Sequence, residues 1–388
     1  MNVLVNCLSA VSGGAVSYLR NLIPKLSKLF NSSEASHSIK ILAHMEQKQL
    51  FPSIPESQCI LLTSSRPMGY RRFWWEYCNI GRIVRQHNID VLFNPCQVSP
   101  RLSGIKQVMM LRNMEPFFSY RYHYSLRPRL RNQILALQSQ RSLQAADRVI
   151  AVSDYVKQIL LDRLNVSQNR IQRIYIGRDV NFSPDGDEQD DNKLLKRLGI
   201  RGNFVLTCGS LWPYRRCEDV IKAFDRYQRS ISGNFSLVIS SSLMDARYGK
   251  VIKSAIAESP NADRIHTVGH VPYETMLTLY RRCCLCVIAT EVEACPNIAI
   301  EAMSSGCAIV SSDQPPLPEI FRGCSMVFRS RNIEDLAFKM QHLMSDEQLR
   351  ADLKRQALNR AQDFSWDRCA KQTYLALIKW EEKERLKK

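Results

Sequence analysis

The 388 residues exceed one ordinary core, and at roughly 150 residues per domain we expect two domains. Hydrophobic residues make up 45% of the chain and charged residues 23%, which excludes a disordered basic tail. The formal charge is +17, and residues 1–180 hold 24 basic and 10 acidic residues, so +14 of it lies in the first half. This asymmetry indicates an anionic partner for the first half.

No apolar run approaches the roughly 18 to 20 residues that a membrane-spanning helix requires. The chain starts without the basic and long apolar regions of a secretion signal, so we expect a cytoplasmic protein. Its thirteen cysteines are an odd number, and most lie in apolar runs, which predicts reduced, buried thiols. Cys283 and Cys286 form a C-x-x-C pair without a second pair or a histidine cluster, so we expect no metal site there.

The first half alternates short apolar runs with amphipathic stretches. A helix is predicted where apolar residues recur at helical spacing, at Tyr18, Leu19, Leu22, Ile23 and Leu26. Strands are predicted at Val3–Leu8, Ile39–Ala43, Cys59–Leu62, Val91–Asn94, Val108–Leu111, Val149–Val152 and Ile171–Ile176. This order indicates a parallel sheet covered by helices.

The second half repeats the plan. Strands are predicted at Phe204–Cys208, Leu237–Ser240, Ile265–Val268, Cys284–Ile288, Ala308–Ser311 and Met326–Phe328. The fold class is therefore α/β, with two doubly wound domains. Because ligands of such sheets collect beyond the carboxyl ends of the strands, we expect the chemistry in a cleft where those ends face each other.

The boundary between the halves is predicted from one acidic, breaker-rich run without apolar periodicity, residues 183–192. We expect a first domain at 1–182, a linker at 183–195 and a second domain at 196–365. Residues 366–388 are predicted as a terminal helix.

The densest functional signal is the run from Glu291 to Gly306. Pro296 suits the start of a helix and Gly306 the left-handed residue beyond its end, which predicts a helix over about 296–305. A helix that starts after a strand presents free N–H groups and a positive dipole end, which form an anion site suited to a diphosphate. The amides expected to bind it belong to Asn297, Ile298 and Ala299.

Two glutamates flank this helix start. Glu301 shares a helix face with Asn297, four positions away, and one turn deeper it could accept hydrogen bonds from ribose hydroxyls. Glu293 precedes the helix and is expected near the group that the diphosphate carries. The alternative is that both are solvated glutamates beside a core helix.

A second phosphate element follows the strand predicted at Phe204–Cys208. Gly209 opens a turn that contains Ser210 and leads to the paired Arg215 and Arg216. Arginine guanidinium groups can bind two phosphate oxygens at once. The alternative is that both arginines are exposed charges at a helix cap.

Gly13 and Gly14 form a third turn, after the first predicted strand. Glycine lets a backbone approach a ligand closely. The spacing does not match a dinucleotide-binding fingerprint, so this turn alone is a weak signal.

Together these residues resemble the retaining GT-B glycosyltransferases of family 4, and the resemblance covers nearly the whole chain. The run from Glu293 to Glu301 is similar to the family's E-x7-E motif, and residues 301–319 are similar to its donor-domain signature. Other similar landmarks are Gly13-Gly14, Ala151-Val152-Ser153, Ile176-Gly177-Arg178-Asp179 and Gly269-His270-Val271 with Tyr280. From these landmarks, the resemblance implies that Gly13, Gly14 and Val271 also bind the donor.

The resemblance implies two Rossmann-like domains that face a central cleft. The first domain would bind the acceptor and the second the nucleotide sugar, and the terminal helix would pack back on the first domain. The family also implies retention of configuration, by front-face attack that the leaving phosphate itself assists.

Residue roles follow by matching position. The resemblance implies that Glu293 contacts the donor sugar near its reacting carbon and that Glu301 contacts the ribose. Arg215 stands where the family usually has a phosphate-binding lysine. Ser210 stands where an arginine is common, and Arg216 stands where a glycine is usual, so we expect Arg216 to compensate for Ser210.

The acceptor side contains a second departure. Arg112 stands where the family often places a histidine, and we assign Arg112 and Asn113 to the acceptor side. Arginine stays protonated and cannot act as a base, so its role would be electrostatic or orienting. A D-x-D pair of carboxylates can hold a divalent ion, but the pair in this chain, Asp185 and Asp187, lies in the expected linker, where we expect it to be solvated. We therefore predict a metal-independent reaction without a cofactor other than the nucleotide sugar.

Cationic and aromatic residues gather in the first half. They are Arg71, Arg72, Phe73, Trp74 and Trp75, with Arg121, Arg127, Arg129, Arg131 and Arg141. Such a surface can dock on anionic lipid headgroups, which would suit a lipid-linked or glycan acceptor and a peripheral protein at the inner face of a membrane. The alternative is a solvated face with its tryptophans in the core.

Two other functions stay open. A nucleic-acid-binding protein would suit the pI of about 9.4, but the chain has no zinc-finger spacing, RNP-type motif or basic heptads. A degenerate transferase that binds nucleotide sugar without transferring it is compatible with Ser210 and Arg112. The sequence leaves the base open between UDP and GDP, and it leaves the acceptor and the linkage open.

Overall fold

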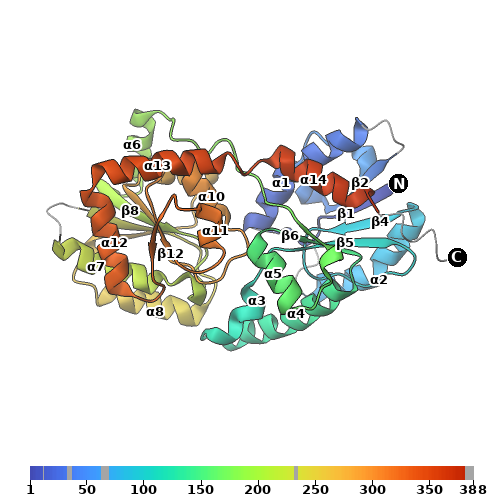
Figure 1. Cartoon of the computed structure of the whole chain (residues 1–388), viewed down its shortest axis with the longest axis horizontal. Coiled ribbons are helices and arrows are strands. Elements are labelled where there is room, and N and C mark those ends of the chain that lie inside the picture. The colour runs from blue at the N-terminus through green and yellow to red at the C-terminus, as the bar shows by residue number, and fades with distance from the viewer. Residues whose placement is uncertain (12, 33–36, 63–69, 231–234, 381–388) are drawn as a thin grey trace. The chain divides into compact units, whose positions relative to one another are not determined.

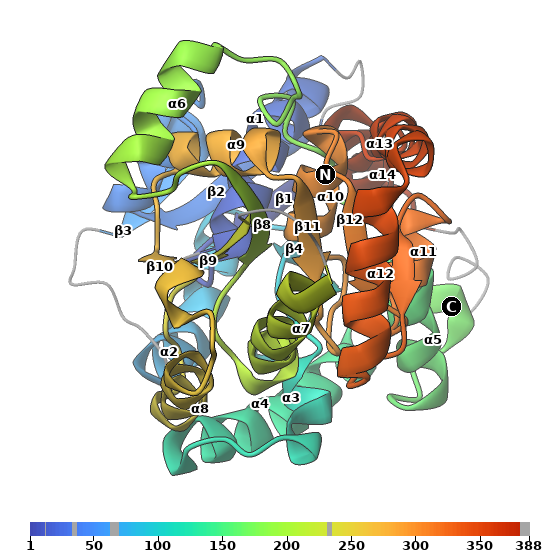
Figure 2. The ribbon, with the colours of Figure 1, turned by 90° about the vertical axis from the view of Figure 1, so that its left-hand side faces the viewer.

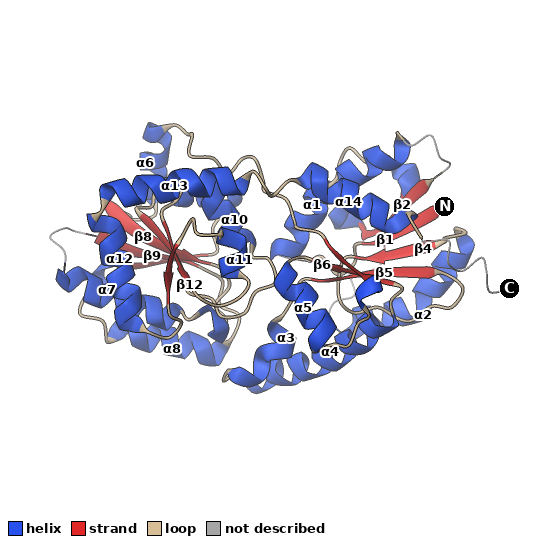
Figure 3. Ribbon diagram, in the orientation of Figure 1, coloured by secondary structure: helices blue, strands red, loops and turns tan. Residues whose placement is uncertain are grey.

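A computed structural model describes residues 1–11, 13–32, 37–62, 70–230 and 235–380. The described residues form two compact units, each a parallel sheet between helices (Figures 1 and 3). Unit 1 comprises 1–113, 134–177 and 365–388, and unit 2 comprises 114–133 and 178–364. The predicted α/β class of two doubly wound domains is confirmed.

Unit 1 contains a seven-stranded parallel sheet of order β3-β2-β1-β4-β5-β6-β7. Its strands are β1 (Asn2–Asn6), β2 (Ser38–His44), β3 (Cys59–Leu62), β4 (Val91–Asn94), β5 (Lys106–Leu111), β6 (Arg148–Ala151) and β7 (Ile171–Arg173). Its helices are α1 (Gly13–Asn31), α2 (Tyr70–Gln86), α5 (Asp154–Asp162) and α14 (Trp366–Ile378). The long helix α4 (Leu126–Ala145) begins among the residues of unit 2 and ends in unit 1.

Unit 2 contains a six-stranded parallel sheet of order β10-β9-β8-β11-β12-β13. Its strands are β8 (Asn203–Cys208), β9 (Phe235–Ser240), β10 (Ile265–Gly269), β11 (Leu285–Ile288), β12 (Ile309–Ser312) and β13 (Met326–Phe328). Its helices are α3 (Glu115–Phe118), α6 (Glu188–Arg197), α7 (Cys217–Ser230), α8 (Ala246–Ala257), α9 (Tyr273–Arg282), α10 (Asn297–Ser304), α11 (Leu317–Phe321), α12 (Ile333–Ser345) and α13 (Glu347–Ala361).

Each predicted β segment overlaps a strand of the described residues, because apolar runs this short between helical stretches are typical of parallel sheets buried on both faces. In unit 2, helices α7, α8 and α12 cover one face of the sheet, and α9 and α10 cover the other (Figure 2). The core between the sheet and the first group includes Val205, Phe224, Leu285 and Leu336, all fully buried.

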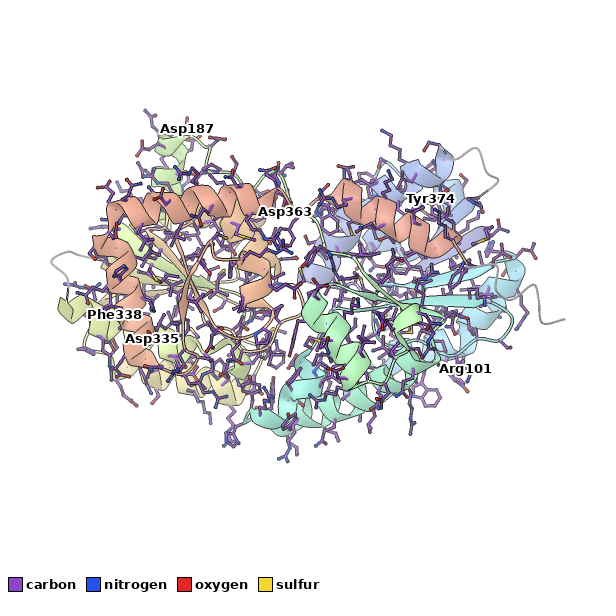
Figure 4. All side chains as sticks on the ribbon, viewed as in Figure 1. Arg101, Asp187, Asp335, Phe338, Asp363 and Tyr374 are labelled. Carbon is purple, nitrogen blue, oxygen red and sulfur yellow. The ribbon has the colours of Figure 1, made fainter. Side chains whose placement is uncertain are left out.

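The residues expected as a linker, 183–195, are a loop only at their start, because α6 begins at Glu188. The Asp187 carboxylate caps this helix by accepting from the amides of Gln189 and Asp190, and acidic residues in the first turn complement its dipole (Figure 4). Asp191 accepts hydrogen bonds from Arg281 and from Thr278 of α9. Helix α6 is therefore a packed part of unit 2.

The terminal helix packs on α1 within unit 1. The rings of Tyr18 and Trp366 lie 5.6 Å apart and those of Phe30 and Tyr374 5.0 Å apart. Tyr374 is labelled on α14 in Figure 4. The helix is shorter than the predicted 366–388, because the backbone leaves helical geometry after Ile378, and residues 381–388 lie outside the described part. A Cβ atom at Gly177 would lie 2.3 Å from the Trp366 backbone, so this landmark glycine permits the close approach of α14.

Residues 114–133 group with unit 2, although they fall inside the range 1–182 expected for the first domain. Ser125 donates hydrogen bonds from its backbone N–H (2.9 Å) and its hydroxyl (3.1 Å) to the Asp245 carboxylate, which caps α8. The ring of Tyr124 lies 5.8 Å from that of Trp212. These polar and aromatic contacts bind the segment to unit 2.

Candidate donor site in unit 2

The strand order of unit 2 reverses between β8 and β11, which lie side by side. Ligands of open α/β sheets bind at this topological switch point, beyond the carboxyl ends of the strands. Here β8 leads into a turn at Gly209, and β11 leads into the loop before α10. The two phosphate elements expected from the sequence therefore lie at one edge of the sheet.

Helix α10 begins as predicted. Pro296 is the residue that caps its N-terminus, with φ −73° and ψ 122°, and the N–H of Ala299 donates to the Pro296 carbonyl at 3.1 Å. The N–H groups of Asn297 and Ile298 lie at the start of the helix, where no carbonyl of the helix is placed to accept from them. Gly306 has a φ of +66°, which glycine adopts without strain, and it ends the helix as predicted. The free end of α10 faces the β8–β11 edge and suits an anion.

Arg215 and Glu293 form an ion pair between the two loops, with side chains 17% and 12% exposed. Burial raises the pKa of Glu293, and the Arg215 charge and Thr290 oppose this rise. Burial lowers the pKa of Arg215, but the Glu293 carboxylate outweighs that effect, so the net shift is upward. The Arg215 Nε has no hydrogen-bond partner among the described residues, so a donor remains at the site.

Glu301 lies on α10 and accepts a hydrogen bond of 3.1 Å from the Tyr280 hydroxyl. The Tyr280 oxygen also lies 3.0 Å from the sulfur of Cys208, at the end of β8. Burial raises the pKa of Glu301 to about 7, with Tyr280 lowering it and Asp179 raising it. Tyr280 therefore orients Glu301; the sequence indicated Tyr280 only as a landmark, because nothing in the spacing of α9 predicts this contact.

The turn after β8 is shaped by its backbone. Gly209 has a φ of +112°, and its N–H donates to the Ser240 carbonyl at 3.0 Å. This geometry brings the backbone of Gly209 and Ser210 to the sheet edge, where a Cβ atom at Gly209 would lie 3.4 Å from the Arg215 guanidinium carbon. That distance is an ordinary contact, so it is the positive φ that favours glycine at position 209.

Arg216 is bound within its own turn. It adopts the left-handed conformation (φ +52°) and donates two hydrogen bonds, of 2.8 and 2.9 Å, to the Asp219 carboxylate. It also pairs with Glu218 at 2.7 Å. The structure therefore leaves Arg215 directed at the site and commits Arg216 to the start of α7.

A pocket opens at this edge of unit 2. It is lined by Thr207, Cys208, Gly209, Leu211, Arg215, Cys217, Ile239, Ser241, Val287, Ile288, Ala289, Thr290 and Ile298. It contains both the Arg215 side chain and the first turn of α10. Val271 lies outside this lining and is buried in the loop that follows Gly269.

An acidic residue that sequence reasoning did not single out, Glu291, lies in the same loop. Arg331 donates two hydrogen bonds to it, of 2.7 and 2.8 Å, and the Ser330 hydroxyl donates a third of 2.7 Å. Burial raises the pKa of Glu291, but the hydrogen bonds from Arg331 and Ser330 lower it by more, so the net shift is downward. Glu291 anchors the loop that carries Glu293.

The remaining expected site residues belong to unit 1. Gly13 begins α1 with a φ of +55°, followed by Gly14. The Arg112 guanidinium lies 5.1 Å from the centre of the Tyr18 ring, and burial lowers its pKa. The backbone of Asn113 exchanges hydrogen bonds with the Gln97 side chain, at 3.1 and 3.3 Å. Arg112 is thus packed on an aromatic ring.

Within the described ranges, no helix is long and apolar enough to cross a membrane. Among the same residues, no group of three or more histidine, cysteine, aspartate or glutamate side chains is placed to hold a metal ion.

Comparison with known families covers both halves of the chain. Residues 190–360 match the family described as Glycosyl transferases group 1, and residues 12–182 match the one described as Glycosyltransferase Family 4. The chain belongs to the GT-B glycosyltransferases of family 4. The family resemblance inferred from Glu293, Glu301 and the landmark residues is confirmed.

Relatives of this GT-B glycosyltransferase include two proteins of Escherichia coli. The O-antigen chain mannosyltransferase B is 20% identical over 352 residues, which are 90% of this chain and 86% of that protein. The serotype-specific mannosyltransferase WbdA is 21% identical over 224 residues, or 58% of this chain. The match spans 28% of the length of WbdA.

The fold also matches solved structures. The Anabaena protein Alr3699/HepE, solved in complex with UDP and glucose, superimposes with a TM-score of 0.72. The match covers 96% of this chain and 98% of HepE at 17% sequence identity, a level at which the likeness shows the fold.

Proposed function

We propose that this protein transfers a hexose-type sugar from a nucleoside diphosphate sugar to a glycan or lipid-linked saccharide, with retention of configuration. The observation that carries the proposal is the largely covered Arg215–Glu293 ion pair, with side chains 17% and 12% exposed, beside the start of α10 at the switch point of unit 2. The E. coli relatives named as mannosyltransferases, one of them for the O-antigen chain, support a hexose donor and surface-polysaccharide synthesis.

In the proposed reaction, the bond between the anomeric carbon and the diphosphate oxygen breaks, and an acceptor hydroxyl oxygen forms the new bond on the same face. The acceptor proton passes to the leaving phosphate. Negative charge grows on the diphosphate, and the amides of Asn297 and Ile298 with the Arg215 guanidinium would stabilise it. The Glu293 carboxylate would stabilise the positive charge at the sugar carbon.

The nucleoside would bind one turn deeper on α10. The Glu301 carboxylate, oriented by Tyr280, can accept hydrogen bonds from two ribose hydroxyls. The base stays open between uracil and guanine. A thermal-shift panel of UDP-, GDP- and ADP-sugars would identify it, because a ligand that binds the folded state raises the melting temperature by mass action.

In this proposal Arg215 and the helix amides stabilise the negative charge of the leaving diphosphate, so we expect a reaction without a divalent metal. Sugar transfer should proceed at an unchanged rate in excess EDTA. Complete loss in EDTA, with recovery on adding magnesium, would contradict this part of the proposal.

A protein of the same fold that binds nucleotide sugar without transferring it is the second candidate. Ser210 and Arg112, which stand where arginine and histidine are common in the family, favour it. Calorimetric binding of nucleotide sugars combined with a hydrolysis assay separates the two: a binder gives heat without release of nucleoside diphosphate.

Our proposal includes a peripheral position on the inner face of an anionic membrane, and one face of α4 supports it. Four apolar side chains spaced along that face are exposed: Leu126 (79%), Leu130 (55%), Ile134 (48%) and Leu137 (61%). The buried side chains Asn132, Ser139 and Leu143 lie on the opposite face of the helix.

Charge on α4 agrees with this partner. The helix carries Arg127, Arg129, Arg131 and Arg141 and contains no aspartate or glutamate. Near an anionic surface each arginine would contribute about 1 kcal/mol. On α2, Trp74 is 60% exposed and Tyr77 61%, whereas Trp75 packs on the core, so the alternative of a core position applies to Trp75 and not to Trp74.

Flotation with liposomes tests the membrane partner. We expect recovery with phosphatidylglycerol vesicles and little with pure phosphatidylcholine, and Leu130→Gln combined with Leu137→Gln should reduce it severalfold. Phe338→Gln, an equally exposed apolar position on α12, serves as the matched control. Equal recovery with neutral and anionic vesicles would remove the membrane from the proposal.

A further inference from the structure

Unit 1 has a switch point of its own, which lies between β1 and β4, where its strand order reverses. Asn6 is the last residue of β1 and Asn94 the last of β4, so both lie at the carboxyl edge. Both side chains are buried, at 1% and 0% exposure. The place where a doubly wound sheet binds its ligand is therefore polar in unit 1 as well.

Asn6, supported by Asn94, holds a carboxylate from α2. The Asn6 amide nitrogen donates to the Glu76 Oε1 at 3.2 Å and to the Asn94 Oδ1 at 2.9 Å. Asn94 donates in turn to the Ser99 hydroxyl at 2.9 Å, and the Asn6 oxygen accepts from the N–H of Leu8. These bonds fix the Glu76 carboxylate at the sheet edge, where its side chain is 1% exposed.

Two polar atoms of this cluster lack hydrogen-bond partners among the described residues. They are the Glu76 Oε2, an acceptor, and the Arg72 Nε, a donor. The Arg72 Nε lies 3.8 Å from the Glu76 Oε1, which is an ion-pair distance but too long for a hydrogen bond. Leaving such groups unpaired in the interior destabilises the folded protein.

The two unpaired atoms define the chemistry of a missing partner. A hydroxyl group can donate to the carboxylate oxygen and accept from the guanidinium N–H at once. An anion would be repelled by Glu76, and an amine would be repelled by Arg72. The Arg72 side chain is 20% exposed, so the cluster opens to solvent on the arginine side.

We propose that Glu76 and Arg72 bind a hydroxyl of the acceptor saccharide at the β1–β4 edge of unit 1. This rests on the proposed transferase function and extends it to named residues that bind the acceptor. Asn6 acts as a positioning residue, because its amide nitrogen donates to the Glu76 carboxylate, and Asn94 supports it by accepting the second hydrogen bond of the same nitrogen.

The test uses methyl glycosides of α-mannose, α-glucose and α-galactose as probes, measured by saturation-transfer NMR on the full chain. In the wild type we expect an NMR saturation-transfer signal for at least one glycoside. In Glu76→Gln, which keeps the size of the side chain, we expect the affinity for that glycoside to be at least fivefold weaker. Arg72→Lys should weaken the binding of the same glycoside. Glu56→Gln, at an exposed glutamate of unit 1, should leave it unchanged.

Two controls separate this site from the donor site. Glu293→Gln should retain the glycoside signal, because that residue belongs to unit 2. A thermal shift by UDP- or GDP-sugar should be equal in wild type and Glu76→Gln, which also shows that the variant is folded. If no nucleotide sugar shifts the wild type, the proposed function fails.

If nucleotide sugars bind but no glycoside does, or if Glu76→Gln binds glycosides as the wild type does, the acceptor assignment is overturned and the cluster holds a water only.

Discussion

Units 1 and 2 share one sheet plan and differ in what they place at the switch point. In unit 2 the edge carries a helix start and an arginine directed at a pocket, which suits a diphosphate. In unit 1 the edge carries a carboxylate held by Asn6, with one donor and one acceptor unpaired beside it, which suits a neutral hydroxyl. Topology thus sets where a ligand binds, and the side chains at the strand ends set which chemistry it has.

The strongest way to break the comparison is to neutralise the carboxylate of unit 2. Glu293→Gln should lower kcat for sugar transfer roughly 10²- to 10³-fold, the size of effect seen when one charge-stabilising group is lost. Turnover with nucleotide sugar and acceptor would be compared with that of Glu347→Gln, an exposed glutamate on α13. Wild-type turnover in Glu293→Gln would remove this residue from the reaction.

The units also differ in how their chains run, since unit 1 includes helix α14, which follows unit 2 in the sequence. Gly177→Ala would place a methyl group against Trp366 and should destabilise unit 1 by about 2 kcal/mol or more. Thermal unfolding would show a melting temperature lower by several degrees. Gly81→Ala, whose Cβ would meet its nearest neighbour at 3.6 Å, is the control; an equal loss there would contradict the explanation.

Tyr280 sharpens the donor half of the comparison. Tyr280→Phe removes one hydrogen bond to a half-buried carboxylate and should raise KM for the nucleotide sugar about tenfold, with a smaller change in kcat. Tyr227→Phe, in the core of the same unit, is the control. An unchanged KM would mean that Glu301 keeps its orientation without Tyr280.

Glu301 should also make the KM for the donor depend on pH. Because the pKa of Glu301 is about 7, its charged form is lost as pH falls through 7, and KM for the donor should rise there. The Tyr280 hydrogen bond lowers that pKa, so Tyr280→Phe should move the rise to higher pH. A KM that stays flat from pH 6 to pH 8 would count against ribose binding by the Glu301 carboxylate.

The smallest effect concerns Arg216. Its guanidinium is occupied by Asp219 and Glu218, and its φ of +52° is one that glycine adopts without strain. Arg216→Gly should change the transfer rate less than about threefold. A loss as large as that of Glu293→Gln would mean that Arg216 binds phosphate, as the sequence had led us to expect.

Much of the fold could be predicted from the sequence, because the strands are short apolar runs and α10 is bounded by Pro296 and Gly306. Helix α6 was missed because its cap, Asp187, and its acidic first turn look the same in sequence as a solvated loop. At the site, local spacing located Glu293 and Glu301.

Contacts between residues far apart in the sequence had no such signal. The Arg215–Glu293 pair joins two loops that follow neighbouring strands but are far apart in the sequence, with β9 and β10 between them, and Tyr280 reaches Glu301 from another helix. Glu76 drew no attention because it lies within a basic, aromatic stretch, and only the sheet topology brings it to Asn6 and Asn94.

The packing of α14 on α1 affects the order of assembly on the ribosome. All of unit 2 is translated before Trp366, so unit 2 can complete its core while the surface of α1 that receives Trp366 and Tyr374 is still bare. A nascent chain stalled before residue 365 would therefore display an apolar surface that chaperones recognise, and a split version of this enzyme would have to supply α14 together with the N-terminal fragment.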